Sequence, residues 1–187
     1  MSTITLLGTG TCQIEVERRA SSVLLDLEGT YVLFDCGHGV VQRLLEAGVG
    51  HNQLEHIVLS HFHPDHVSDI IPFLQAGAWS QRDPRTTDIH IYGPAGVQKI
   101  IDGLLQVFGP SSLQQSSYKI VVHEITQQQF EIGSYRFDFI SLPPASNHGL
   151  RFVWNEKKQD YVMDSAHGPS TGTQLVEDAE AEPSSEL

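Results

Sequence analysis

A histidine-rich junction between an apolar run and a helical pattern, HIVLSHFHPDHVSDIIPFL at residues 56–74, restricts the fold of this chain more than any other segment. Its first five residues are a short apolar run of the kind found in buried strands. The apolar residues that follow have the i, i+3, i+4, i+7 spacing of a helix: Val67, Ile70, Ile71 and Leu74. Pro72 predicts a kink there, because proline lacks the N–H of a helical hydrogen bond. The chain therefore has to pass from a strand into a helix through a polar turn.

The same two patterns continue along the chain. Strands are expected near residues 4–7, 22–27 and 30–35, with Glu28-Gly29 as a hairpin turn between the last two. Helices are expected from about 40 to 48 and over 97–108, the second ending at Gly109-Pro110. Further strands are expected at 88–92, 118–125, 134–142, 150–154 and 159–163. Strands alternate with helices early and dominate later, which predicts a mixed α/β layered fold.

Length and composition indicate one globular domain. The chain has 187 residues, of which 40% are hydrophobic and 18% are charged. We expect the domain to cover residues 1–170 and the Ser- and Glu-rich residues 171–187 to form an acidic, disordered tail. There is no membrane-length apolar run and no signal-peptide pattern, and the two cysteines do not form a disulfide framework. These features predict a cytoplasmic protein without a membrane partner.

The net charge limits the class of partner. Eleven Lys and Arg residues stand against 23 Asp and Glu residues, which gives a net charge of −12. Because non-specific nucleic-acid binding depends on neutralising phosphates, this charge argues against it. A small phosphodiester or nucleotide substrate remains compatible with an acidic protein that holds a metal.

The polar turn carries four side chains of the kinds that ligate metals. His61 and His63 lie two apart on an extended backbone and so project from the same side. Pro64 suits the first turn of a helix, which would place Asp65 and His66 on that turn. Four such side chains in six residues can serve two adjacent metals, and Asp65 can also act as a general base. The alternative is a histidine-rich surface turn.

Several segments together resemble a known family. HFHPDH resembles the signature of the metallo-β-lactamase superfamily. The segments LLGTG, SSVLLDL, YVLFDCGHG, LSHFHPDHVSDIIPFL and IYGPAG follow the order of its ribonuclease Z-like branch, over about residues 3–170. The resemblance implies an αββα sandwich, here with an incomplete second half. It also implies a site for two Zn²⁺ ions per chain, with Mn²⁺ or Fe²⁺ as alternatives.

The resemblance also assigns residues to that site. It implies that His61 and His63 bind the first metal and that Asp65 and His66 bind the second, with Asp65 as the catalytic base. Asp35, at the end of its predicted strand, would orient the histidines; the alternative is that it caps the following Gly-rich turn.

The second half departs from the family pattern at expected ligand positions. The third histidine of the family aligns with Pro143, and the nearest candidate is His148. The bridging aspartate aligns with Ala166 or, in a second alignment, corresponds to Asp164, and His167 is the last histidine. We include Asp164 in the predicted ligand set, and His148 and His167 stay open as replacement ligands. An incomplete second sheet would leave an uncovered edge, which favours either homodimer formation or aggregation.

Two functions follow from these residues. The first is a metal-dependent hydrolase, a phosphodiesterase that cleaves a nucleotide, cyclic nucleotide or RNA end through a metal-bound hydroxide. The second is a catalytically degenerate protein that keeps the fold for binding or regulation. The intact HFHPDH segment favours the hydrolase, while Pro143 and Ala166 favour the degenerate protein.

Overall fold

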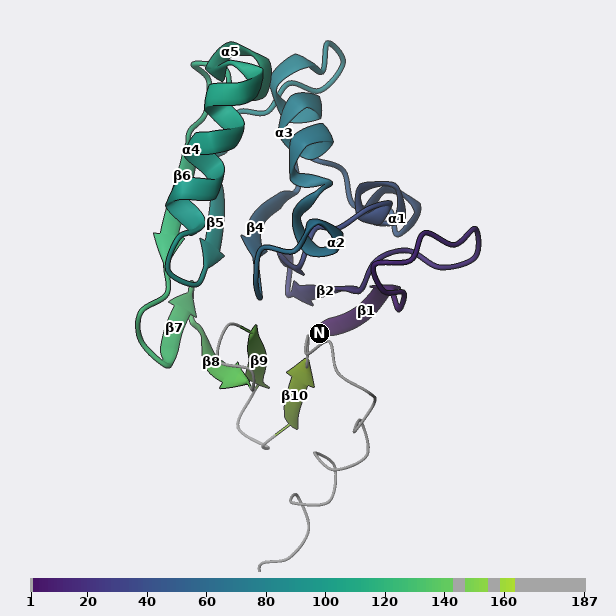
Figure 1. Cartoon of the computed structure of the whole chain (residues 1–187), viewed down its shortest axis with the longest axis vertical. Helices are drawn as coiled ribbons and strands as arrows, with labels where there is room; N and C mark the ends of the chain where they lie inside the picture. The colour runs from purple at the N-terminus through teal and green to yellow at the C-terminus, as the bar shows by residue number, and fades with distance from the viewer. Residues whose placement is uncertain (1, 143–146, 155–158, 164–187) are drawn as a thin grey trace, which may run out of the picture.

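The computed structural model describes residues 2–142, 147–154 and 159–163 and contains two β-sheets (Figure 1). The larger sheet has six strands in the order β1-β2-β3-β4-β5-β6. These strands are β1 (Thr3–Gly8), β2 (Ser22–Leu27), β3 (Thr30–Phe34), β4 (Leu54–Val58), β5 (Ile89–Gly93) and β6 (Ile120–Glu124). β1, β2 and β3 pair antiparallel, whereas β3, β4, β5 and β6 pair parallel. The carboxyl ends of the four parallel strands therefore lie at one edge of the sheet.

The smaller sheet contains the last four strands in the order β10-β9-β8-β7, and every pair is antiparallel. These strands are β7 (Gln129–Ile132), β8 (Tyr135–Leu142), β9 (Asn147–Trp154) and β10 (Gln159–Met163). They lie at the end of the molecule opposite α3, α4 and α5 (Figure 1).

All described helices pack on one face of the six-stranded sheet. They are α1 (Val40–Glu46), α2 (Pro64–Val67), α3 (Ile70–Trp79), α4 (Val97–Phe108) and α5 (Pro110–Leu113). Their apolar side chains, such as Leu44, Phe73 and Ile101, form one core with Leu33 and Ile57 of the sheet. None of these helices is both long and apolar enough to cross a membrane.

A second core joins the two sheets. Alternate residues of β3 and β4, Phe34 and Val58 among them, point away from the helices and contact residues of the smaller sheet such as Phe137. The Phe34 and Phe137 rings lie 6.1 Å apart. This alternation, with one set of side chains facing the helices and the other facing the second sheet, is what a strand buried on both faces requires. Within the described residues the layers are therefore helix, sheet and sheet.

The structure differs from the predicted elements in three places. The short helix α5 forms directly after Gly109, where a polar loop was expected, with Pro110 as its first residue. The polar strand β7 was not predicted, because the sequence QFEI has few apolar residues to mark it. The interruption predicted at Pro72 takes the form of a break four residues earlier: Ser68 and Asp69 divide the helical stripe into α2 and α3. Pro72 has no N–H for the carbonyl oxygen of Ser68, so a continuous helix would lose that hydrogen bond. Pro72 is the third residue of α3, where its missing N–H removes no hydrogen bond within the helix.

Candidate metal centre

The turn after β4 gathers three imidazole rings. The ring centre of His61 lies 4.6 Å from that of His63 and 4.2 Å from that of His66. α2 begins at Pro64, so Asp65 and His66 lie on its first turn, as the sequence predicts. His61, Asp65 and His66 are buried, whereas His63 is exposed. The predicted convergence of these four side chains is therefore present in the fold.

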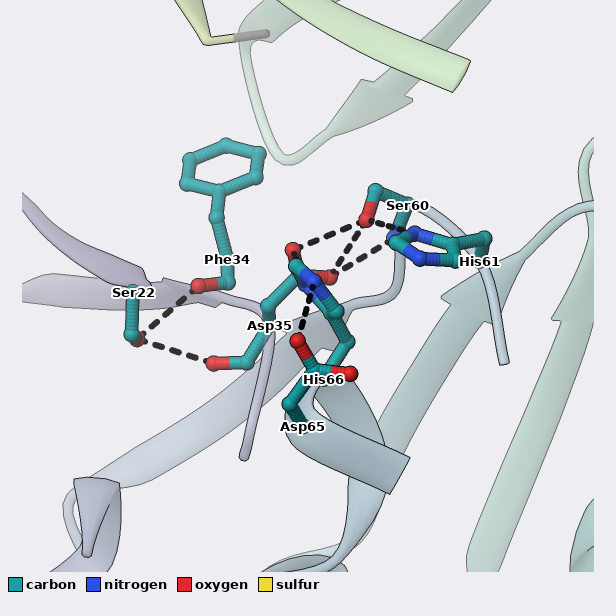
Figure 2. Close-up of polar contacts among 7 residues, drawn as sticks. All are labelled: Ser22, Phe34, Asp35, Ser60, His61, Asp65 and His66. Atoms are coloured by element: carbon teal, nitrogen blue, oxygen red, sulfur yellow. Dashed lines mark hydrogen bonds and ion pairs between the residues drawn. The ribbon is translucent and has the colours of Figure 1, made fainter. Parts of the chain in front are cut away.

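Asp35 anchors this cluster from the end of β3 (Figure 2). Its fully buried carboxylate accepts hydrogen bonds from the Ser60 backbone N–H at 2.8 Å and from the Ser60 hydroxyl at 2.9 and 2.8 Å. It also contacts Nδ1 of His66 at 2.7 Å. Of the two roles considered for Asp35, these contacts favour orienting the histidines.

The same contacts select the tautomers of two histidines. Because a carboxylate only accepts hydrogen bonds, His66 has to donate its Nδ1 proton to Asp35. The single Ser60 hydroxyl proton is likewise given to Asp35, so the hydroxyl oxygen accepts the Nδ1 proton of His61 at 3.0 Å. Both imidazoles therefore keep Nε2 as the nitrogen with a lone pair, which is the arrangement that a metal-ligating histidine needs.

A second serine fixes the backbone that carries Asp35. Asp35 has a φ of 57°, a left-handed conformation that a non-glycine residue rarely adopts. The buried hydroxyl of Ser22 contacts the carbonyl oxygens of Phe34 at 2.9 Å and Asp35 at 2.8 Å, as Figure 2 shows. The strained turn is therefore held by a neighbouring strand, and it aims the carboxylate at His66 and Ser60.

Backbone contacts join the turn after β3 to α2. The Cys36 N–H donates to the carbonyl oxygen of His66 at 2.7 Å, and the Asp69 N–H donates to the carbonyl oxygen of Cys36 at 2.9 Å. The Asp69 carboxylate accepts the Val41 N–H at 3.1 Å, at the start of α1. This carboxylate therefore links the start of α1 to the segment between α2 and α3. Asp69 itself lies at the break in the helical stripe.

Gly37 allows this close approach, and its replacement by alanine is expected to destabilise the protein. A Cβ atom at residue 37 would overlap the carbonyl oxygen of Asp65 and crowd Ala20. We expect Gly37→Ala to lower the free energy of unfolding by about 2 kcal/mol in urea denaturation. Gly103→Ala is the control, since open space surrounds that helical position. Alanine there should raise the free energy of unfolding by about 1 kcal/mol. Equal stability of wild type and Gly37→Ala would contradict the close packing.

Burial and charge act in opposite directions on His66. Desolvation alone would lower its pKa, but the hydrogen bond and negative charge of Asp35, together with the charge of Asp65, raise the pKa of His66 above its ordinary value. The neighbouring thiol behaves differently: burial, and then the charges of Asp69 and Asp35, raise the pKa of Cys36. Cys36 is therefore a buried thiol and not a nucleophile at neutral pH.

The imidazole and carboxylate groups of the cluster are donors that transition metals bind, and one pair of them has the spacing of two ligands on one metal. Oδ2 of Asp65 lies 3.4 Å from Nε2 of His66, and two ligands at about 2.0–2.1 Å from one Zn²⁺ with a tetrahedral angle have about this separation. Among the described residues, no group of three or more His, Cys, Asp and Glu side chains is arranged to hold a metal ion. The cluster thus provides suitable donors and one suitably spaced pair.

The ligand candidates in the second half fall largely outside the described residues. Pro143, Asp164, Ala166 and His167 belong to the segments that the structure leaves undescribed. His148 lies in β9, where its backbone pairs with Ser141 of β8. Sequence reasoning gave no role to Ser60, which links His61 to Asp35; its only sequence signal is its place between an apolar strand and the first histidine.

Most of the chain matches the model of a single family. Residues 2–143 match the model of the family described as anti-Pycsar protein Apyc1. This match covers more than half of the chain and includes the whole histidine cluster. The chain belongs to the Apyc1 family.

Other relatives of this Apyc1-family chain agree on the fold. Ribonuclease Z of Mycolicibacterium gilvum is 36% identical over 108 residues, which cover 58% of this chain and 38% of that protein. The crystal structure of the short form of human tRNase Z superposes with a TM-score of 0.69 at 24% identity, over 88% of this chain and 64% of that one. Zn²⁺-bound PqqB from Methylobacterium extorquens superposes with a TM-score of 0.59 at 13% identity, over 87% of this chain and 64% of that one.

These similarities confirm the predicted fold and superfamily. The Apyc1-family chain has an α/β metallo-β-lactamase-like fold and is a member of a hydrolase family of that fold. It spans about two fifths of the length of the curated ribonuclease Z relatives that it matches.

Proposed function

We propose that this chain is a metal-dependent phosphodiesterase that hydrolyses cyclic nucleotides. The observation that carries the proposal is the anchored cluster of His61, His63, Asp65 and His66, in which Asp35 and Ser60 select the tautomers of two histidines. Partners that fix the tautomer of a histidine are typical of metal-ligating histidines, and this supports the proposal.

The residues divide the work of hydrolysis as follows. His61 and His63 would hold one metal, and Asp65 and His66 a second, with Zn²⁺, Mn²⁺ or Fe²⁺ as candidates and Asp164 as a further proposed ligand. A bound metal supplies Lewis acidity and an activated water. Asp65 is the proposed general base, because its carboxylate lies beside His66 in the cluster. Asp35 is a positioning residue that keeps His66 in its donor tautomer.

Family membership favours cyclic nucleotides as the substrate class. The matching family is named for anti-Pycsar proteins, and such proteins degrade cyclic nucleotides. The similarity to ribonuclease Z supports a second candidate, an RNA 3′ end. The net charge of −12 opposes a long RNA substrate more than a cyclic mononucleotide, because an RNA presents many phosphates.

A substrate comparison tests the proposal. The full chain, loaded with Zn²⁺ or Mn²⁺, is incubated with 3′,5′-cyclic mononucleotides and separately with a precursor tRNA, and the products are resolved by chromatography. We expect ring opening of the cyclic nucleotides that is lost in Asp65→Asn, because the amide cannot take up a proton. Cleavage of the precursor tRNA alone would favour the second candidate. Metal binding without turnover of either substrate would support the degenerate, regulatory function.

A further inference from the structure

A ladder of three histidines and one tyrosine crosses three parallel strands, and the proposed function leaves it unused. His56 lies on β4, His90 and Tyr92 on β5, and His123 on β6. In the strand register His56 faces His90 and Tyr92 faces His123, so all four side chains share one face of the sheet. The rings of His56 and His90 are 5.3 Å apart, and those of Tyr92 and His123 are 4.4 Å apart and nearly parallel at 11°.

This face of the sheet is the one that carries the smaller sheet. Tyr92 is a buried member of the core between the sheets. Its ring lies 5.5 Å from that of Phe130 on β7, which in turn lies 5.2 Å from Phe137 on β8. The ladder therefore continues directly into the contact that holds β7 and β8 on the larger sheet.

One hydrogen bond within the ladder forms only while at least one of its two histidines is neutral. Nδ1 of His90 and Nε2 of His123 are 3.0 Å apart, with ring centres at 5.2 Å and planes inclined by 21°. One nitrogen has to donate its proton and the other has to accept it, so the two imidazoles cannot both be protonated in this contact. Nδ1 of His56 also contacts the Tyr92 hydroxyl at 3.4 Å. Because the Tyr92 hydroxyl can donate or accept, this contact serves either protonation state of His56, and the constraint lies in the His90–His123 pair.

The described surroundings offer little compensation for positive charge. Glu124 and Glu131 border a cavity of about 250 Å³ beside His123, but Glu124 already accepts the Gly96 N–H at 2.8 Å. Asp138 on β8 accepts a hydrogen bond from Gln129. Within the part of the chain that the structure describes, no ion pair joins a carboxylate to a ladder histidine.

We propose that His56, His90, His123 and Tyr92 form a proton-sensitive latch, which holds β7 and β8 on the six-stranded sheet at neutral pH and releases them on acidification. In the neutral state the rings contact one another and support Phe130. Protonation of neighbouring histidines places positive charges at adjacent ladder positions, and protonation of both His90 and His123 removes the acceptor that their hydrogen bond needs. The packing of Tyr92 against Phe130 is then weakened, and with it the contact between the two sheets.

The electrostatics give the direction and the pH window. Burial, followed by the charges of His90 and His123, lowers the pKa of His56 from 6.5 to about 4. Burial, followed by the charge of His90, also lowers the pKa of His123. The open state therefore takes up protons that the closed state does not bind, so closure is fully favoured above pH 6.5 and weakens as the pH falls toward 4.

The test compares local opening at pH 7 and pH 5 in metal-free full chain. Amide hydrogen exchange, corrected for its intrinsic pH dependence, is measured by mass spectrometry in residues 129–142 and in residues 22–34. On going from pH 7 to pH 5, we expect the exchange rate of the first segment to rise about tenfold more than that of the second. This factor is part of the effect that proton uptake by one half-buried histidine would give if it were fully coupled to opening. The triple variant His56→Gln/His90→Gln/His123→Gln should lose this difference, whereas His51→Gln, outside the ladder, should keep it.

A titration of the wild type provides an independent outcome. The imidazole Cε1 proton of His56, assigned by NMR with His56→Gln, should titrate well below pH 6. Titration near pH 6.5 would overturn the proposal even if the triple variant does not fold. Equal pH dependence of exchange in wild type and triple variant would overturn it as well. Neither readout depends on the proposed hydrolysis.

Discussion

The double variant His61→Ala/His63→Ala is expected to lose its bound metal and, with it, turnover of cyclic nucleotides by about a thousandfold or more. Both residues supply imidazole donors to the cluster, and their rings lie 4.6 Å apart. Removing both leaves Asp65 and His66 as the only pair in the HFHPDH segment. Elemental mass spectrometry on protein purified without a His tag measures the first effect, and cyclic-nucleotide hydrolysis measures the second.

His51→Ala provides the matched control for this experiment. His51 lies in a loop, where its ring contacts the carbonyl oxygen of Asp83 at 3.0 Å, so its loss removes a histidine without touching the cluster. Metal content and rate should match those of the wild type. If the double variant keeps the metal and rate of the wild type, the proposed centre is wrong. Loss of metal without any activity in the wild type would leave a structural or regulatory metal site.

The isosteric variant Asp35→Asn is expected to weaken metal binding by about 10- to 100-fold, although Asp35 is not a proposed ligand. The Asp35 carboxylate accepts from Ser60 and from Nδ1 of His66. An asparagine that keeps its oxygen toward Ser60 turns its amide N–H toward His66. His66 would then have to accept at Nδ1 and carry its proton on Nε2, which removes the lone pair needed by the metal.

Competition against a chelating dye gives the metal affinity, and ¹⁵N NMR of the His66 ring reports its tautomer. Asp26→Asn is the control, because the Asp26 carboxylate accepts the Gly29 N–H in the β2–β3 hairpin, away from the cluster. A merely structural role of Asp35 would lower stability without exchanging the His66 tautomer. Unchanged metal affinity in Asp35→Asn would show that the tautomer of His66 does not control binding.

Local sequence patterns were sufficient where a few neighbouring residues decide the structure. α4 ends at Phe108 before Gly109-Pro110, as its apolar stripe and breaker residues predict. The β2–β3 hairpin turns at Glu28 and Gly29, both with positive φ. The cluster itself follows from the spacing of HFHPDH, because an extended backbone followed by Pro64 at a helix start brings its side chains together.

Contacts between residues far apart in sequence needed the tertiary structure. Asp35 and His66 are 31 positions apart, so the hydrogen bond that selects the His66 tautomer has no local sequence signal. The Asp69 carboxylate, at the break before α3, binds the N–H of Val41, which lies 28 positions earlier in the chain. β7 forms because Phe130 and Ile132 pack on the larger sheet, although the intervening residues are polar.

The sequence by itself therefore determined the types of the candidate ligand side chains, the strand-to-helix turn that presents them and the superfamily. The tertiary structure decided which nitrogens keep their lone pairs, through the buried Asp35 carboxylate, and where the histidines of β4, β5 and β6 meet. The physical reason for this division is the range over which each property is decided. Side-chain spacing along one segment is fixed by backbone geometry, whereas hydrogen-bond partners and protonation are fixed by the strands that folding places next to one another.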